Sequence, residues 1–180
     1  NVLVHGDSLN HAENRLENFW QWNHNPDDAK WSFTARSGWL RLTASPAVGL
    51  MDAKNTLSQR TCGPQCEFTV ELDAAGLAAG GRAGLAALQW DCALVGVEAQ
   101  ADGSYRLFTA KRDVIDRTTP PTPQADVFTA PLSGARVFLK AAFDFRDVEG
   151  TRIGVYFPDG GVSEIQRAQM ETQEGGNVAV

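Results

Sequence analysis

The chain has 180 residues and a mass of 19.5 kDa, which is the length of one ordinary domain. A chain of this size buries roughly 70% of its unfolded surface on folding, so its core needs neither a metal nor a disulfide for stability. Sixteen Lys and Arg against 22 Asp and Glu give a net charge of −6, which offers nucleic acid and anionic membranes no electrostatic attraction. The sequence has no apolar run long enough to span a bilayer. The charge does not argue against binding to a neutral partner such as a sugar.

Short alternating apolar runs, interrupted by turn signals about every ten residues, predict strands along most of the chain. The clearest run is Cys-Glu-Phe-Thr-Val-Glu-Leu at 66–72, and Asp102-Gly103 predicts a hairpin turn between 95–99 and 105–110. Helical patterns are scarce and weak, at 10–18 and 164–173, whereas 74–84 reads as a flexible loop and 118–123 as a rigid connection. We expect strands at 38–42, 66–72, 85–88, 93–97, 105–110, 137–145 and 152–157. This pattern predicts an all-β fold, a two-sheet antiparallel β-sandwich forming one domain over 1–180.

The three cysteines, Cys62, Cys66 and Cys92, are too few for a disulfide framework. Cys62 and Cys66 flank a Gly-Pro-Gln turn, and two interpretations stay open. They form a short local disulfide in an oxidising compartment, or they are two ordinary, partly buried thiols. A zinc site is disfavoured because the three histidines lie far from this pair in the sequence.

Catalytic motifs are absent from the sequence: it has no nucleophile elbow, no zinc-protease motif, no phosphate loop and no dinucleotide fingerprint. Glycoside hydrolysis needs two facing carboxylates, so the acidic residues deserve inspection. Glu67 and Glu71 fall on the polar side of the 66–72 strand, which indicates a solvated face. Asp91 follows Trp90 at the expected end of a strand and is interpreted as a turn residue. A stand-alone glycan hydrolase is therefore the weakest hypothesis.

The most informative segment is Phe-Trp-Gln-Trp-Asn-His-Asn-Pro-Asp-Asp-Ala-Lys-Trp at 19–31, with three tryptophans in twelve residues. Tryptophan faces can stack on sugar rings, and Asn, His and Asp side chains can hydrogen-bond hydroxyls, which is the mixture that a carbohydrate site needs. The same residues also suit a buried aromatic core with an Asn-Pro-Asp turn network. Composition alone favours this second, structural interpretation.

Several blocks resemble the C-terminal β-sandwich domain of family 43 glycoside hydrolases, the β-xylosidase and arabinofuranosidase enzymes. They are Trp-Gln-Trp-Asn-His-Asn-Pro-Asp at 20–27, Asn-Thr-Leu-Ser-Gln-Arg-Thr at 55–61, Ala-Gly-Leu at 83–85 and Val-Gly-Val at 95–97. The resemblance covers about 7–160. It implies a concanavalin-A-like fold, or jelly roll, an association with xylan, and packing against a catalytic propeller. That propeller carries the family's catalytic carboxylates and is absent here, so the resemblance places no catalytic residue in this chain.

Two departures from the family pattern stand out. An acidic Asp-Gly-Asp stretch of the family reads Gly-Gly-Arg at 80–82, so both acids are lost. The closing strand of the family is not recognisable within 161–180, which makes the C-terminal part divergent.

We predict a non-catalytic carbohydrate-binding accessory domain for xylan-type β-glycans, normally attached to a family 43-like hydrolase. The alternative is a structural lobe that packs on a catalytic propeller and shapes its active site without binding sugar. The expected partners are xylan or xylo-oligosaccharide and a catalytic propeller, with no nucleic acid and no membrane. No cofactor is expected, although Asp7, Asp27 and Asp28 could serve a structural Ca²⁺. Because xylan is extracellular, we expect a secreted or periplasmic protein. The predicted carbohydrate-contacting residues are Trp22, Asn23, His24, Asn25, Trp31, Gln59, Arg60 and Trp90.

Overall fold

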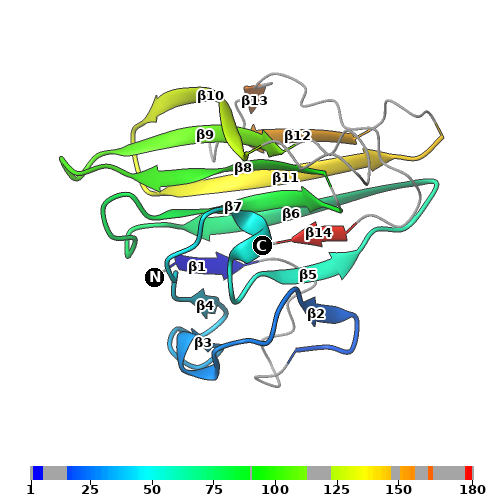
Figure 1. The fold of residues 1–180 in the computed structure, drawn as a ribbon, viewed down its shortest axis with the longest axis horizontal. Coiled ribbons are helices and arrows are strands. Elements are labelled where there is room, and N and C mark those ends of the chain that lie inside the picture. Colours follow the sequence, from blue (N-terminus) through cyan, green and yellow to red (C-terminus); the bar gives the residue numbers. More distant parts are fainter. Residues whose placement is uncertain are drawn as a thin grey trace.

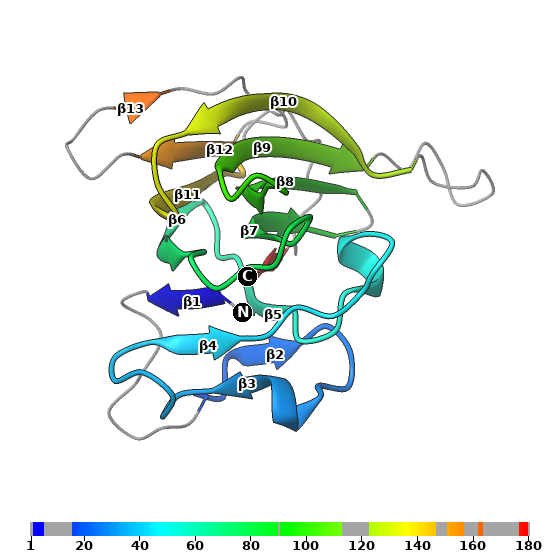
Figure 2. The ribbon, with the colours of Figure 1, turned by 90° about the vertical axis from the view of Figure 1, so that its left-hand side faces the viewer.

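The computed structural model describes residues 2–5, 16–89, 91–112, 123–146, 151–156, 162–163 and 177–179, with residues 2, 3 and 5 and the last three ranges described by their backbone. These residues form two antiparallel sheets of seven strands each, which pack face to face (Figures 1 and 2). The prediction of an all-β, two-sheet antiparallel β-sandwich is confirmed.

The chain crosses several times between the two sheets, so each sheet combines strands from distant parts of the sequence. In spatial order the first sheet contains β13 (Val162–Ser163), β12 (Thr151–Tyr156), β11 (Arg136–Asp144), β6 (Gln65–Asp73), β1 (Val2–His5), β4 (Leu40–Leu42) and β3 (Trp31–Ser32). In spatial order the second sheet contains β10 (Ala125–Leu132), β9 (Tyr105–Arg112), β8 (Cys92–Ala99), β7 (Arg82–Leu88), β14 (Asn177–Ala179), β5 (Leu57–Arg60) and β2 (Trp20–Trp22). Two short 3₁₀ turns, η1 (Asp28–Lys30) and η2 (Leu50–Asp52), lie in the connections.

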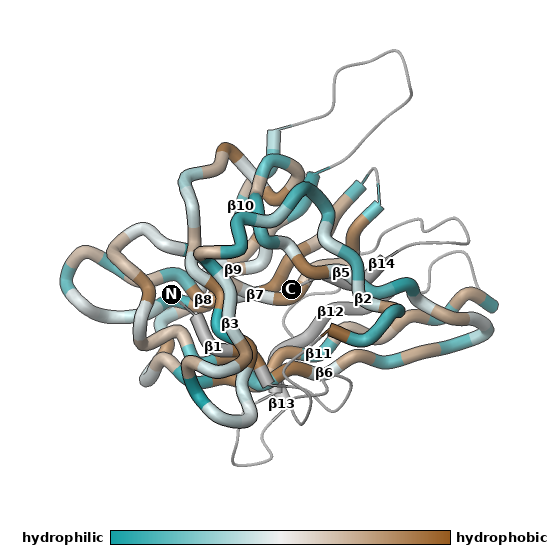
Figure 3. Tube along the Cα trace, turned by 90° about the horizontal axis from the view of Figure 1, so that it is seen from below, coloured by the Kyte–Doolittle hydropathy of each residue, from teal (hydrophilic) through white to brown (hydrophobic). Residues whose placement is uncertain are grey.

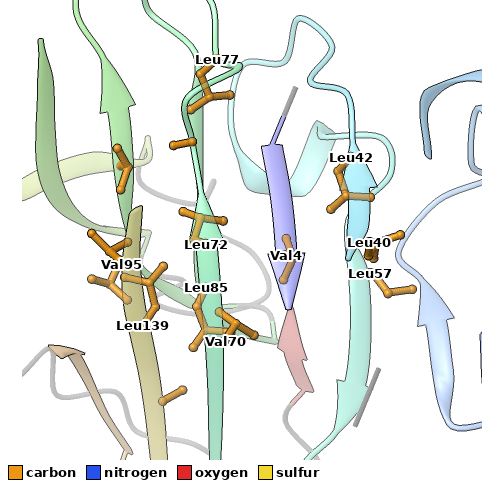
Figure 4. Close-up of a cluster of buried hydrophobic side chains, with 14 of the residues drawn as sticks. Val4, Leu40, Leu42, Leu57, Val70, Leu72, Leu77, Leu85, Val95 and Leu139 are labelled. Carbon is orange, nitrogen blue, oxygen red and sulfur yellow. The ribbon is translucent and has the colours of Figure 1, made fainter. Parts of the chain in front are cut away.

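The core lies between the two sheets and follows from the period-two pattern of the strands. In β6 the side chains of Val70 and Leu72 are fully buried, and Leu139 of the neighbouring β11 is buried beside them. Leu85 and Val95 of the second sheet face them across the interior (Figure 4). The alternation of hydrophobic and hydrophilic residues is visible along β6 and β11 in Figure 3. Because these apolar side chains are buried between the two sheets, they contribute to the hydrophobic stabilisation of the fold.

Seven expected strands are confirmed, namely those that became β4, β6, β7, β8, β9, β11 and β12. The hairpin turn at Asp102-Gly103 is confirmed too: Gly103 has φ of 83°, and the Asp102 side chain accepts a hydrogen bond of 2.9 Å from the Ser104 amide. Among the described residues, the pattern did not predict β1, β2, β3, β5, β10, β13 or β14. The proposed turns of helix at 10–18 and 164–173 and the connection at 118–123 lie largely outside the described residues.

Two of the family-like blocks, at 83–85 and 95–97, each place a glycine at the same point of two neighbouring strands. Gly84 of β7 and Gly96 of β8 lie directly opposite one another in the register. A Cβ atom at Gly84 would lie 2.1 Å from the Val95 carbonyl oxygen, and one at Gly96 would lie 2.3 Å from the Ala83 carbonyl oxygen. Both distances are far too short, so the two backbones approach in a way that only glycine permits.

Candidate functional site

Five of the predicted residues meet at one edge of the sandwich, where β2 of the second sheet and β3 of the first come together (Figure 2). We call this the tryptophan edge; it comprises Trp22, Asn23, His24, Asn25 and Trp31. The indole rings of Trp22 and Trp31 lie 5.4 Å apart between centroids and are tilted by 50°. Both rings are partly buried and pack against the main core, which leaves part of each ring exposed to solvent.

The strand register explains why this edge is aromatic. β2 pairs with β5 so that Trp22 lies opposite Leu57 and Trp20 opposite Gln59. Leu57 is fully buried, so the tryptophans share its inward face, and Gln21 between them points outward. Trp20 is 6% exposed and packs edge-on against Phe68, with ring centroids 5.7 Å apart. The tryptophan-rich segment therefore contributes to the core as well as to the surface.

Much of the polar character of this segment is used to hold the fold. His24 Nε2 lies 2.5 Å from the Met51 carbonyl oxygen. The Asp27 amide donates to Asn55 Oδ1 at 2.8 Å, and Asn55 Nδ2 donates to the Asp27 carbonyl at 3.0 Å. Asn55 is buried with φ of 59°, a backbone conformation that asparagine tolerates better than most residues. These bonds fasten the 23–27 segment to the 51–55 segment.

The remaining predicted residues lie at different places. Gln59 is on the inward face of β5, and its Oε1 atom is buried without a hydrogen-bond partner among the described residues. Asn23 Nδ2 is likewise buried without a hydrogen-bond partner among the described residues, whereas the Asn23 backbone amide donates to the Thr56 carbonyl at 2.9 Å. Arg60 ends β5 with an exposed side chain that points outward, away from the tryptophans. Trp90 lies outside the described residues.

A second surface feature is a cavity of about 670 Å³ between the 43–56 segment and the strands β7, β8 and β9. We call it the sheet hollow. It reaches from the outer side of these strands to Val4 and Leu72 at the end of the core. Its polar lining includes Ser45, Lys54, Arg82 and Gln124, and none of the predicted residues that the structure describes lines it. Gln124 Oε1 accepts a hydrogen bond of 2.9 Å from the Leu50 amide, which fixes the segment that forms one wall.

A charged cluster lies at the rim of the sheet hollow on the outer side of the second sheet. The register places Arg82, Glu98 and Arg106 in one row across β7, β8 and β9. Arg82 donates to Glu98 at 2.6 Å and to both carboxylate oxygens of Asp126 at 2.7 Å, while Arg106 donates to Glu98 at 2.9 Å. The Arg82 guanidinium also lies 4.6 Å above the ring of Phe108.

The cluster contains a pair of carboxylates on one sheet face, Glu98 and Asp126, whose pairing no pattern in the sequence predicts. The hydrogen bond from Arg82 is the main cause that lowers the pKa of Asp126. Burial raises the pKa of Glu98, but hydrogen bonds from Arg106, Gln100 and Arg82 outweigh it, and the net direction is down. A glycosidase acid needs a raised pKa so that it is protonated at the working pH. Both groups are held ionised, as partners of arginine.

Two acidic residues inspected in the sequence are paired on the outer side of the first sheet. Glu67 Oε2 lies 2.6 Å from Lys140 Nζ, and Glu71 pairs with Arg136. The prediction of a solvated face is confirmed for Glu67, whose side chain is 62% exposed, but not for Glu71, which keeps only 12% because it packs with Arg136. Asp91 lies in the turn between β7 and β8, where its carbonyl accepts a hydrogen bond of 2.9 Å from the Gln89 amide.

In the part of the chain that the structure describes, no three His, Cys, Asp or Glu residues are gathered closely enough to hold a metal ion. The Asp27 side chain accepts from the Ala29 amide at 3.2 Å, and Asp28 accepts from Trp31 Nε1 at 2.9 Å. Asp7, the third residue considered for Ca²⁺, lies outside the described residues.

None of the helical segments in the described ranges combines the length and hydropathy that a membrane crossing requires.

The fold and its surfaces define the chain as a concanavalin-A-like β-sandwich domain. The family model of the β-xylosidase C-terminal concanavalin-A-like domain, named GH43_C2, matches residues 8–156. The chain belongs to this family. The expected resemblance to the C-terminal domain of family 43 glycoside hydrolases is thereby confirmed.

Relatives and solved structures agree with this assignment. A putative β-xylosidase of Xylanibacter ruminicola is 38% identical over 103 residues, covering 54% of this chain and 18% of that protein. A β-xylosidase of Formosa agariphila is 33% identical over 111 residues, covering 49% of this chain and 19% of that protein. A bifunctional GH43-CE protein of Bacteroides eggerthii has a TM-score of 0.75 at 32% identity, covering 92% of this chain and 21% of that one. The chain thus spans less than a fifth of the curated relatives.

Proposed function

We propose that this domain binds the xylan-type β-glycans on which an attached family 43 catalytic domain acts, and that it is itself non-catalytic. The observation that carries the proposal is the Trp22–Trp31 pair, two partly exposed indoles 5.4 Å apart at the edge of the sandwich. Aromatic faces of this kind provide an apolar platform for the C–H faces of sugar rings. The named β-xylosidase relatives support xylan as the glycan class.

Polar side chains near the two indoles would orient a bound sugar through hydrogen bonds to its hydroxyls. Asn25 is exposed three residues after Trp22, and His24 is exposed while its Nε2 atom contacts the Met51 carbonyl. Asn23 keeps one buried polar atom, Nδ2, without a partner among the described residues, so a small movement of this side chain would offer a further bond to a hydroxyl. We expect modest affinity, because a sugar exchanges hydrogen bonds with water for bonds with protein at small net gain.

The proposal includes the setting of the domain. Xylan is extracellular, so we propose that the protein is secreted or periplasmic. Hydrolysis is assigned to a separate catalytic domain, since the described carboxylates on the outer side of the second sheet, Glu98 and Asp126, are held ionised by arginine. Under this proposal the domain raises the local concentration of substrate near its catalytic partner.

A pair of tryptophan variants tests the site. Trp31→Ala removes one indole of the edge, and we expect it to weaken xylohexaose binding about tenfold, equivalent to 1.4 kcal/mol. Trp39→Ala is the control for loss of an indole, because Trp39 is not part of the tryptophan edge as defined and is buried, with the Arg36 guanidinium 4.4 Å from its ring centroid. Asn25→Ala adds a change at an exposed position with little cost to the fold. Equal affinity of the Trp31→Ala variant and the unaltered protein, with both melting cooperatively, would contradict the proposed site.

A second candidate function is docking on the catalytic domain without sugar binding. The observation in its favour is the tip of the wall of the sheet hollow, where Pro46, Ala47 and Val48 are exposed and Val48 retains 96% of its surface. An apolar tip of this kind suits insertion into a partner surface. Val48→Asp would then weaken association with the catalytic domain while leaving calorimetric sugar binding unchanged. Unchanged association of the Val48→Asp variant with the catalytic domain would contradict docking through this tip.

A further inference from the structure

Two cysteines lie at the crossing between the two sheets. β5 belongs to the second sheet and β6 to the first, and the connection between them contains Cys62. Cys66 is the second residue of β6, where it pairs with Phe143 of β11. Both thiols are free in this structure. A disulfide between them would therefore link the beginning of β6, in the first sheet, to the connection that follows β5 of the second sheet.

The two cysteines are four residues apart at this crossover. The backbone and the thiol of Cys62 lie near enough to the Cys66 thiol to influence its pKa. Cys62 is exposed and Cys66 is partly buried, so an oxidant can reach the pair from solvent through Cys62. Cys92 is fully buried in a separate cluster with Ala86 and Leu88, so it does not compete for either partner.

We propose that Cys62 and Cys66 form a reversible disulfide that closes the crossover between the two sheets. The chemistry is thiol–disulfide exchange with a small external disulfide such as oxidised glutathione. The Cys62 thiolate attacks one sulfur of that disulfide, forming a mixed disulfide and releasing one glutathione thiolate. The Cys66 thiolate then attacks the Cys62 sulfur and releases the second glutathione. The protein loses two protons and two electrons, and the glutathione disulfide takes up both electrons.

The order of attack follows from exposure. Burial raises the pKa of the Cys66 thiol above its ordinary value, which keeps it protonated in solution near neutral pH. The exposed Cys62 thus meets the oxidant first, and Cys66 acts as the resolving thiol once the mixed disulfide lies beside it.

The fold does not depend on this bond. The Phe145 amide donates to the Pro64 carbonyl at 2.9 Å, and Gln65 Nε2 donates to Asp144 at 2.6 Å, so the crossover is anchored to β11 in the reduced protein. Closing a loop of five residues removes a modest part of the unfolded chain's freedom. We expect the oxidised protein to melt about 3–8 °C higher than the reduced protein.

Peptide mapping tests the proposal directly. Trypsin cleaves after Arg60, Arg82 and Arg106, so one peptide carries both Cys62 and Cys66 and the next carries Cys92. The 180-residue protein is equilibrated with excess oxidised glutathione, denatured, alkylated and digested. We expect the first peptide to be unalkylated and two hydrogen atoms lighter, the Cys92 peptide to be alkylated, and dithiothreitol to reverse the change. The melting shift should disappear in Cys62→Ser and persist in Cys92→Ser.

Three results would overturn the proposal. One is alkylation of both Cys62 and Cys66 after oxidation at equilibrium. Another is a stable glutathione adduct on Cys62, which would mean that Cys66 does not resolve it. The third is a disulfide-linked dimer in place of the internal bond. Each is read by mass, so a variant that folds poorly does not obscure the outcome.

Discussion

The tryptophan edge and the sheet hollow differ in how closely their side chains are packed. The tryptophan edge is filled: large aromatic rings pack on the core, and neighbouring polar groups bind backbone atoms of the 51–56 segment. The sheet hollow is open, with a cavity of about 670 Å³ and a glycine pair among its lining strands. A segment rich in side chains suited to sugar binding can therefore be used mainly to stabilise the fold. The cavity, by contrast, is lined by residues that no sequence motif marks as functional.

The largest expected effect is on the filled region. Trp22→Ala removes an indole that packs against the core and against Trp31, and it leaves a cavity that the edge cannot fully close. We expect a loss of about 3 kcal/mol in the free energy of unfolding, measured by urea titration. A loss below about 1 kcal/mol would show that the Trp22 indole lies on the surface and does not pack into the core.

The glycine pair at the sheet hollow gives the next effect. Gly84→Ala places a Cβ atom 2.1 Å from the Val95 carbonyl oxygen, so the two backbones must separate. We expect a loss of about 2 kcal/mol in the free energy of unfolding. Gly134→Ala is the matched control, since a Cβ atom there meets nothing within 4 Å. Equal melting temperatures for the two variants would refute the close approach of β7 and β8.

Asn55 joins the two regions, because it lines the sheet hollow and binds the backbone of Asp27. Asn55→Ala removes both hydrogen bonds and leaves a residue with a Cβ at φ of 59°, and we expect a loss of about 2 kcal/mol. Asn55→Gly separates the causes, since glycine accepts this backbone conformation but makes neither bond. If the glycine variant matched the original protein in stability, the hydrogen bonds to Asp27 would be unimportant.

The smallest effect concerns the charged rim of the sheet hollow. The pKa values of Asp126 and Glu98 are lower in the folded protein than in the unfolded chain. Their stabilising contribution is therefore complete above the unfolded values, near pH 4, and is lost as the pH falls through the folded values. Because the cluster is partly exposed, we expect less than about 1 kcal/mol from it. Thermal melts between pH 3 and pH 7 check this: Asp126→Asn should flatten the acid limb of the curve, and an unchanged limb would contradict the assignment.

The sequence predicted the regular part of the fold well, for reasons visible in particular strands. β6 and β11 are long and alternate cleanly, and Asp102-Gly103 marks its turn through glycine's tolerance of positive φ. By contrast, β2 and β5 have three and four residues, too few for a period to emerge. The edge strand β10 contains Pro131 and a bulge near Asp126, both of which break the pattern.

The candidate sites were only partly predictable. The residues at 22–25 lie consecutively in the sequence, and their grouping with Trp31 depends on β2 and β3 meeting at one edge, which no local pattern encodes. The row of Arg82, Glu98 and Arg106 exists only through the register of three strands. The walls of the sheet hollow come from distant segments, including 43–56 and Gln124, and so carried no signal in the sequence.

Calorimetric titration of the reduced domain with xylohexaose, with cellohexaose as the comparison, tests the central claim most directly. We predict saturable heat with xylohexaose, weaker or no heat with cellohexaose, and loss of the xylohexaose signal in the Trp31→Ala variant. An absence of heat with both sugars at millimolar concentration, in a protein that melts cooperatively, would contradict sugar binding by this domain.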